Sequence, residues 1–248
     1  MANPILSRNK NFQPNNALLG SGIQVQGSQL MTVENTLHKT FGLFLIVLIT
    51  AAVGWMIPIV ALPSALVGLG IAIAIAFRKQ PSAPLTIIYA IAEGLFVGAI
   101  SSIFEVRYAG SVSQAVIATF VVVGVTLALF ASGKVRATPK LTKFFFIALV
   151  SYGVFSLINF ALVATGVNDD PYGLRGSVHV FGIPLGIILG LFAVLMGAYS
   201  LIIDFTYLEN GVNNRIEKKY GWFAAYGIVA SVIWIYIEIL RLIGLSRR

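Results

Sequence analysis

The sequence predicts an all-α integral membrane protein with seven transmembrane helices. Hydrophobic residues make up 58% of the 248-residue chain and charged residues only 10%, whereas soluble domains average about 45–50% and about 25%. The apolar residues gather in seven stretches, each near the ~20 residues that a helix needs to cross a bilayer. Little of the chain is left to form a soluble core.

Polar and turn-forming segments separate these stretches. Residues 1–35 are rich in Asn, Gln, Ser and Gly and have few large apolar side chains, so we expect a polar, mobile N-terminal tail. Residues 36–248 are expected to form the transmembrane domain, whose first helix is introduced by a capping sequence that starts at Thr32. Asn, Asp, Pro and Gly over residues 168–173 predict an extramembrane loop. The expected spans are residues 37–57, 60–78, 82–104, 113–132, 143–166, 179–205 and 221–244.

The distribution of Lys and Arg predicts the orientation in the membrane. The N-terminal tail and the second, fourth and sixth loops are basic, the first loop has no basic residue, and the third and fifth loops balance Arg with Asp or Glu. Because basic loops stay in the cytoplasm, the N-terminus is expected there. An odd number of spans then places Arg247 and Arg248 outside, so either these late charges are tolerated or the last segment does not cross completely.

Composition and motifs exclude several classes of protein. The chain has no cysteine and two distant histidines, His38 and His179, which excludes disulfides, thiolate metal sites and a histidine metal cluster. A Walker-type glycine loop, a zinc-protease HExxH motif and a G-x-S-x-G elbow are missing. The net charge of +8 comes from basic residues spread over separate loops, unlike the clustered charge of a nucleic-acid site. We therefore expect neither an enzyme nor a cofactor, and no nucleic-acid partner.

Three acidic residues lie within or at the edge of the apolar stretches, although the chain has only nine Asp and Glu. They are Glu93, Asp204 and Glu238. A carboxylate in hydrocarbon is costly, so each position is a candidate functional site.

Asp204 closes the sixth apolar stretch. It lies ~30 Å along the helix from Pro184, which places it at the cytoplasmic edge. Arg78 ends the second stretch at the same edge, so the two side chains can pair across it. The alternative is that Asp204 is a solvated acid at the membrane interface.

Glu93 and Glu238 differ in their surroundings. Glu93 lies ~17 Å into the third span, near the midplane, where an acid must be protonated, paired or in contact with water. It therefore either belongs to an ion or proton path or is a neutral acid bound to a neighbouring helix. Glu238 lies ~24 Å into the last span. It can form a structural ion pair with Arg241, three residues later on the same helix face, or belong to the path.

Two small-xxx-small patterns, Gly94–Gly98 and Gly186–Gly190, are typical of helices that pack closely. We expect packing within one chain, with dimerisation as the alternative.

Several segments together resemble a known family. They are residues 31–40 (MTVENTLHKT), 54–55 (GW), 93–101 (EGLFVGAIS), 204–212 (DFTYLENGV) and 236–244 (YIEILRLIG). In this order, and with the seven-span layout, they resemble the bacterial branch of the transmembrane Bax inhibitor motif family, the Bax inhibitor-1-like proteins. The likeness covers nearly the whole chain from about residue 31 onward.

The resemblance implies a seven-helix fold with a central last helix, in a bacterial plasma membrane, that forms a pH-sensitive calcium leak. Asp204 matches an acid of the family that latches onto a basic residue ending the second helix, here Arg78. The family pairs that acid with a second one on the last helix. Alignment without gaps puts Ser231 at this position, ~14 Å into the span; a shifted register would instead put Glu238 there. From its depth alone, Glu93 can supply a replacement acid.

The expected function is therefore an ion leak, with calcium as the expected ion, gated by protonation of Asp204. Carboxylate oxygens suit calcium, so Asp204 and Glu93 are its candidate ligands. The alternative is a non-conducting membrane protein that binds and regulates another one, such as a protease or a translocon component. A proton-coupled carrier is a third option, but the loops show no sign of a defined substrate.

Overall fold

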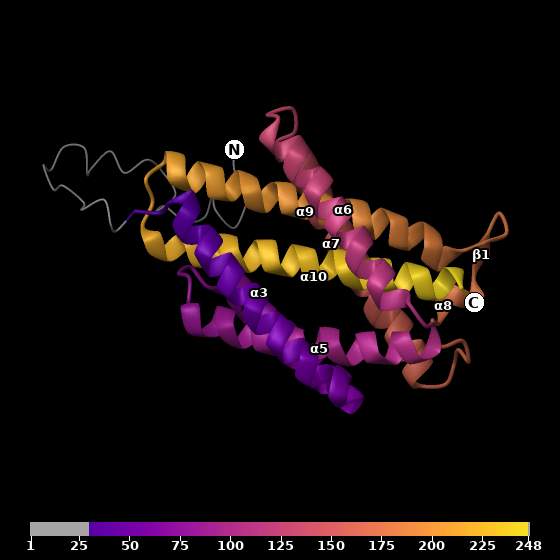
Figure 1. Cartoon of the computed structure of the whole chain (residues 1–248). Helices are drawn as coiled ribbons and strands as arrows, with labels where there is room; N and C mark the ends of the chain where they lie inside the picture. The colour runs from indigo at the N-terminus through magenta and orange to yellow at the C-terminus, as the bar shows by residue number, and fades with distance from the viewer. Residues whose placement is uncertain (1–29, 248) are drawn as a thin grey trace, which may run out of the picture. The chain divides into compact units, whose positions relative to one another are not determined.

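The computed structural model describes residues 30–247, which are almost wholly helical (Figure 1). Seven helices are long and apolar enough to cross a membrane, which confirms the predicted fold class. These helices are α3 (Val33–Met56), the 3-10 helix η3 (Pro58–Val60) with α4 (Ala61–Phe77), α5 (Ala83–Arg107), α6 (Ser111–Ala131), α7 (Pro139–Ala164), α9 (Leu185–Asn213), and η4 (Lys218–Tyr220) with α10 (Gly221–Ser246). A short helix, α8 (Leu174–Ser177), and two short strands, β1 (His179–Val180) and β2 (Ile183–Pro184), precede α9.

The first helix begins where the capping sequence predicts. Thr32 Oγ1 accepts a hydrogen bond from the backbone N–H of Asn35 at 3.1 Å, so the cap is confirmed. Most of the predicted tail, residues 1–29, lies outside the described residues. Its last residues are already ordered, because Met31 is buried and its N–H donates to the carbonyl of Ile216 at 2.8 Å.

The sixth span differs most from its prediction. It was expected to begin at residue 179, but α9 begins at Leu185 because β1 and β2 form an antiparallel hairpin. The turn residues Phe181 and Gly182 have φ angles of 53° and 81°, a conformation that no α-helix contains. At its other end α9 continues to Asn213, past the expected residue 205, because Tyr207 and Leu208 pack into a buried apolar cluster.

The described residues divide into two compact units, residues 30–103 with 203–230 and residues 104–202 with 231–247. The first unit holds α3, α4, most of α5 and the adjoining parts of α9 and α10. The second holds α6, α7, α8, the hairpin and the remaining parts of α9 and α10. The last helix is the most buried of the seven. In its apolar segment 61% of the residues are buried, against 6% to 44% in the apolar segments of the other six helices. This burial fits the expected central last helix.

In the first unit, glycines allow α3 and α5 to cross closely (Figure 1). A Cβ at Gly94 would collide with Val47 and Thr50, and a Cβ at Gly98 would collide with the backbone carbonyl of Ala51. The Gly94–Gly98 pattern therefore packs helices within one chain, as expected.

Replacing Gly98 with Ala is expected to destabilise the protein by about 1–3 kcal/mol, because the backbone of α3 must shift. Gly70 on α4 is the matched control, because a Cβ there meets nothing within 4 Å. Its change to Ala is expected to be neutral or stabilising by up to about 1 kcal/mol. Thermal unfolding of the purified variants in detergent measures both changes, and equal stability of the two would show that the close contact is absent.

The second unit places the end of α10 beside the turn between α5 and α6. Arg247 Nη1 donates to the carbonyl of Ala109 and Nη2 donates to Gln114 Oε1, both at 2.7 Å. Glu105 holds the same turn, because its carboxylate accepts from the N–H groups of Gly110 at 2.6 Å and Val112 at 3.0 Å. The last helix thus runs its full length to this turn rather than stopping short of it.

Candidate functional site

The three acids singled out in the sequence fall into two sites, one in each unit. Glu93 and Asp204 lie in the first unit, and Glu238 lies in the second. Each site is described within its own unit.

The first site is centred on Tyr226 of α10. This tyrosine interacts electrostatically with both Glu93 of α5 and Asp204 of α9. Its ring packs edge-on against Tyr89, with ring centroids 4.8 Å apart and planes at 66°. Tyr89 lies one turn before Glu93 on α5, and the two side chains interact. Two acids and two tyrosines from three helices therefore form one polar site.

Two glycines make room for the carboxyl groups of this site. A Cβ at Gly68 of α4 would lie 2.7 Å from Glu93 Oε1, so the glycine lets the carboxyl group sit against that helix without moving. A Cβ at Gly227 of α10 would collide with the Asp204 carboxyl group. Asp204 therefore rests on the backbone of α10, one residue after Tyr226. Both acids are half-buried.

Arg78 follows the last residue of α4 and is exposed. None of the ion pairs found within residues 30–247 includes it. The Asp204–Arg78 pair therefore stays a prediction.

Ser231, the residue aligned with the family's second acid, lies on α10 in the second unit. It is buried, with 3% of its surface exposed. Its hydroxyl donates to Ser200 Oγ of α9 at 2.9 Å.

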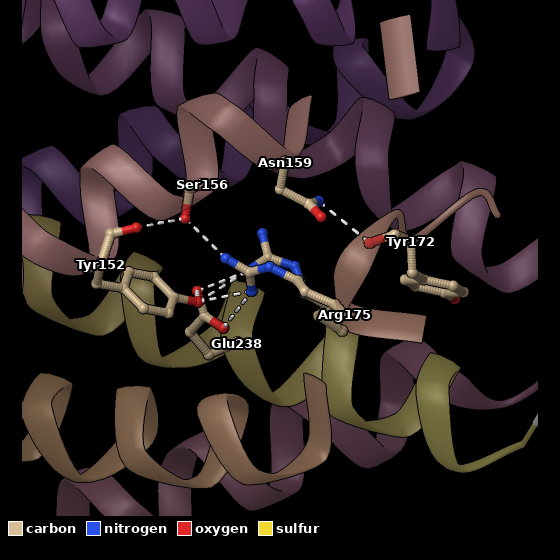
Figure 2. A network of polar contacts seen from close by, with 7 residues as sticks. Tyr152, Ser156, Asn159, Tyr172, Arg175 and Glu238 are labelled. Carbon is tan, nitrogen blue, oxygen red and sulfur yellow. Dashed lines mark hydrogen bonds and ion pairs between the residues drawn. The ribbon is translucent and has the colours of Figure 1, made fainter. Parts of the chain in front are cut away.

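The second site surrounds Glu238 (Figure 2). This residue is 2% exposed. Its Oε1 atom accepts from Arg241 Nη1 and from the Tyr152 hydroxyl of α7, both at 2.7 Å. The structural ion pair expected from the spacing of Glu238 and Arg241 is therefore present.

Arg175 of α8 belongs to this site, although its position in the sequence does not indicate it. Its side chain is 4% exposed, and Nη1 lies 3.9 Å from Glu238 Oε2. It donates to the Tyr152 hydroxyl at 2.8 Å and to Ser156 Oγ at 2.7 Å (Figure 2). In the sequence it appears as a loop residue close to Asp170. The sequence pattern that indicates this site lies on α7, where Tyr152, Ser156 and Asn159 form one polar face at helical spacing.

Asn159 fixes the backbone that presents Arg175. Its Nδ2 donates to the carbonyl of Tyr172 at 3.1 Å (Figure 2). Its Oδ1 accepts from the N–H of Leu174 at 2.7 Å. Gly173 has a φ of 61°, and a Cβ there would lie 2.5 Å from Asn159 Oδ1. The backbone of α8 is thus held against Asn159 of α7, and the guanidinium group of Arg175 holds α8 near Glu238 of α10.

The two sites differ in charge. Around Glu238, two guanidinium groups face one carboxylate, so the carboxylate charge is offset, one positive charge remains, and the contacts connect α7, α8 and α10. Around Tyr226, two carboxyl groups face phenols. Within residues 30–247, no three His, Asp or Glu side chains lie close enough to form a metal site. Because calcium takes 6–8 oxygen ligands, the carboxyl groups of Glu93 and Asp204 alone supply fewer ligands than an enclosed calcium site needs.

Comparison with known proteins assigns the chain to a family. No curated protein matches the sequence. A family model described as Bax inhibitor 1 like, however, matches residues 3–248, nearly the whole chain. Together with the seven apolar helices, this match shows that the chain is an integral membrane protein belonging to the Bax inhibitor 1 like family.

Proposed function

We propose that this protein is a pH-sensitive leak for ions, with calcium as the expected ion, and that protonation of Asp204 opens it. The observation that carries the proposal is the grouping of Glu93 and Asp204 around Tyr226. Family membership supports the same function.

The cost of a carboxylate among apolar helices explains why this grouping suits an ion path. An ionised acid in such a place needs a cation, a hydrogen-bond donor or water beside it. A hydrated cation passing Glu93 and Asp204 meets these needs for both acids in turn. Protons compete for the same oxygens, so acidification changes both the charge of the path and its affinity for the ion.

Asp204 is proposed as the gate because it ends the sixth apolar stretch and Arg78, in the same unit, ends the second, so both are expected at the cytoplasmic edge. When ionised, Asp204 attracts Arg78 and the pair closes the path. A proton or a calcium ion on Asp204 removes this attraction. Arg78 is exposed and forms no ion pair with any described residue, so the closing pair is itself part of the proposal.

Glu238 takes no part in the path under this proposal. Its carboxylate already accepts from Tyr152 and Arg241. A permeating ion would have to displace these partners. We therefore assign Glu238 to structure, and Ser231 to the packing of α10 against α9.

Calcium flux into liposomes tests the proposal. We expect the purified protein to produce a flux that rises on acidification, Glu93→Gln to lower it at every pH, and Glu238→Gln to retain its pH dependence in the folded fraction. Unchanged pH-dependent flux in Asp204→Asn, Glu93→Gln and Glu238→Gln alike would contradict the proposal. Absence of flux, with a membrane protein that still co-purifies with Asp204→Asn, would favour the non-conducting alternative.

A further inference from the structure

A pocket of about 330 Å³ opens in the first unit beside the first turns of α3. One end of its lining is polar and includes Asn35, His38 and Lys39. The other end is apolar and includes Leu43 and Ile46. Ile46 lies ~17 Å further along the helix than Asn35. The pocket is therefore polar at the helix end and apolar toward the middle of the span.

Lys39 is held in a fixed position at the polar end. Its ammonium donates to the carbonyl of Lys218 at 2.6 Å and lies 5.4 Å from the centre of the Trp222 ring, which also lines the pocket. An ammonium has three N–H donors, so two remain for a ligand. Lys218 lies in the same loop, whereas Lys219 is paired with Glu217, so the positive charge of Lys39 and Lys218 favours an anion.

Asn35 requires a hydrogen-bond donor from the ligand, whereas Lys39 requires an acceptor. The Oδ1 atom of Asn35 is buried and accepts no hydrogen bond from any of residues 30–247. Buried acceptors are nearly always paired in folded proteins. Because Asn35 lines the pocket, a turn of its amide toward the pocket would let a ligand that brings a donor complete this site. The complete ligand has a negative charge for Lys39, a donor for Asn35 and an apolar part for Leu43 and Ile46.

We propose that this pocket binds a glycerophospholipid with an anionic headgroup that carries hydroxyl groups, of the phosphatidylglycerol type. The phosphate contacts Lys39, a headgroup hydroxyl donates to Asn35 Oδ1, and an acyl chain lies along Leu43 and Ile46. Basic pockets between transmembrane helices favour anionic lipids in this way, and Trp222 beside Lys39 is typical of the membrane interface. The order of polar and apolar groups along α3 selects a lipid over a free phosphate.

Gly42 offers a way to fill the pocket without disturbing the fold. It lines the pocket, and a Cβ at this position meets nothing within 4 Å. In Gly42→Leu the new side chain occupies the space of the acyl chain. Gly70→Leu is the matched control, because it adds the same side chain at an equally open position of α4 that does not line this pocket.

Native mass spectrometry of the full-length protein, titrated with phosphatidylglycerol and separately with phosphatidylcholine, tests the proposal. We expect one preferred phosphatidylglycerol adduct, lost in Gly42→Leu and retained in Gly70→Leu. Lys39→Gln should weaken it roughly fivefold, the effect of one lysine near an anionic lipid, while Lys39→Arg and the distant control Lys143→Gln should retain it.

Three outcomes would overturn the proposal. Equal binding of the two lipids would show that charge is not recognised. An adduct that persists in Gly42→Leu would place the lipid elsewhere. Competition by soluble glycerol phosphate as strong as that by the lipid would show an anion site with no acyl-chain contact. Because Gly42→Leu leaves Lys39 and its bond to Lys218 in place, these outcomes do not depend on whether Lys39→Gln folds.

Discussion

Replacing Glu238 with Gln is expected to lower the free energy of unfolding by about 3–5 kcal/mol, the cost of removing one partner from a buried ion pair. Glu238 Oε1 accepts from Tyr152 and Arg241 at 2.7 Å, and Arg175 lies 3.9 Å from its other oxygen. Without the carboxylate, two guanidinium groups face each other around the half-buried Tyr152. The loss is large because neither cation gains a substitute partner.

The matched control for this change is Glu217→Gln. Glu217 pairs with Lys219 at 2.7 Å, but the two side chains are 63% and 42% exposed, so the change should cost less than about 1 kcal/mol. Unfolding of both variants in a mixed-detergent titration compares them directly. Equal loss in the two variants would contradict a structural role for the buried network, and a loss of flux in Glu238→Gln without loss of stability would assign this acid to the ion path.

Replacing Asp204 with Asn is expected to raise the calcium flux at alkaline pH and to flatten its pH dependence. The sign follows from charge. An amide is neutral at every pH, like the protonated acid, so it cannot attract Arg78. An ion pair at a solvated edge is worth up to about 1 kcal/mol, so the flux at alkaline pH should rise by up to about fivefold.

Arg78→Gln should have the same effect as Asp204→Asn, because it removes the other half of the proposed pair. Combining the two changes should add nothing further, since each alone abolishes the same interaction. Lys143→Gln, which removes an exposed lysine near the start of α7, should leave the pH profile unchanged. Additive effects of Asp204→Asn and Arg78→Gln would show that the two residues act separately.

The sequence predicted the seven spans because their signal is local. Composition and length define a span, the cap at Thr32 depends on residues within one turn, and the Glu238–Arg241 pair follows from helical spacing. The glycines of α5 were also recognised as packing positions, although their partners Val47 and Ala51 were not. Each of these features depends on neighbours along one helix.

The features that the sequence did not predict lie where the chain folds back on itself. Arg175 has the sequence context of a solvated loop residue, and only the contacts of Asn159 with Tyr172 and Leu174 bring it against α7. The start of α9 was placed too early because Val180, Phe181 and Ile183 continue the apolar pattern, whereas the turn at Gly182 interrupts the helix. Hydropathy alone cannot distinguish an apolar hairpin from the first turns of a helix.

The same limit applies to Tyr226. The sequence does not distinguish it from other residues of the span, because tyrosines are common in apolar helices. Its importance appears only when α5, α9 and α10 come together and place Glu93 and Asp204 beside it. The sequence therefore predicted the two acids of the candidate site, because a carboxylate in a membrane is energetically costly. It did not predict the tyrosine that lies between them.

The most direct test of the proposed leak is calcium uptake by liposomes that contain equal amounts of wild-type protein or Asp204→Asn, with the external pH stepped from alkaline to acidic. The account predicts that uptake by the wild type rises after the step, whereas uptake by Asp204→Asn is already high before it and changes little. The same rise in both preparations, or no uptake above that of protein-free liposomes in either, would contradict gating by Asp204.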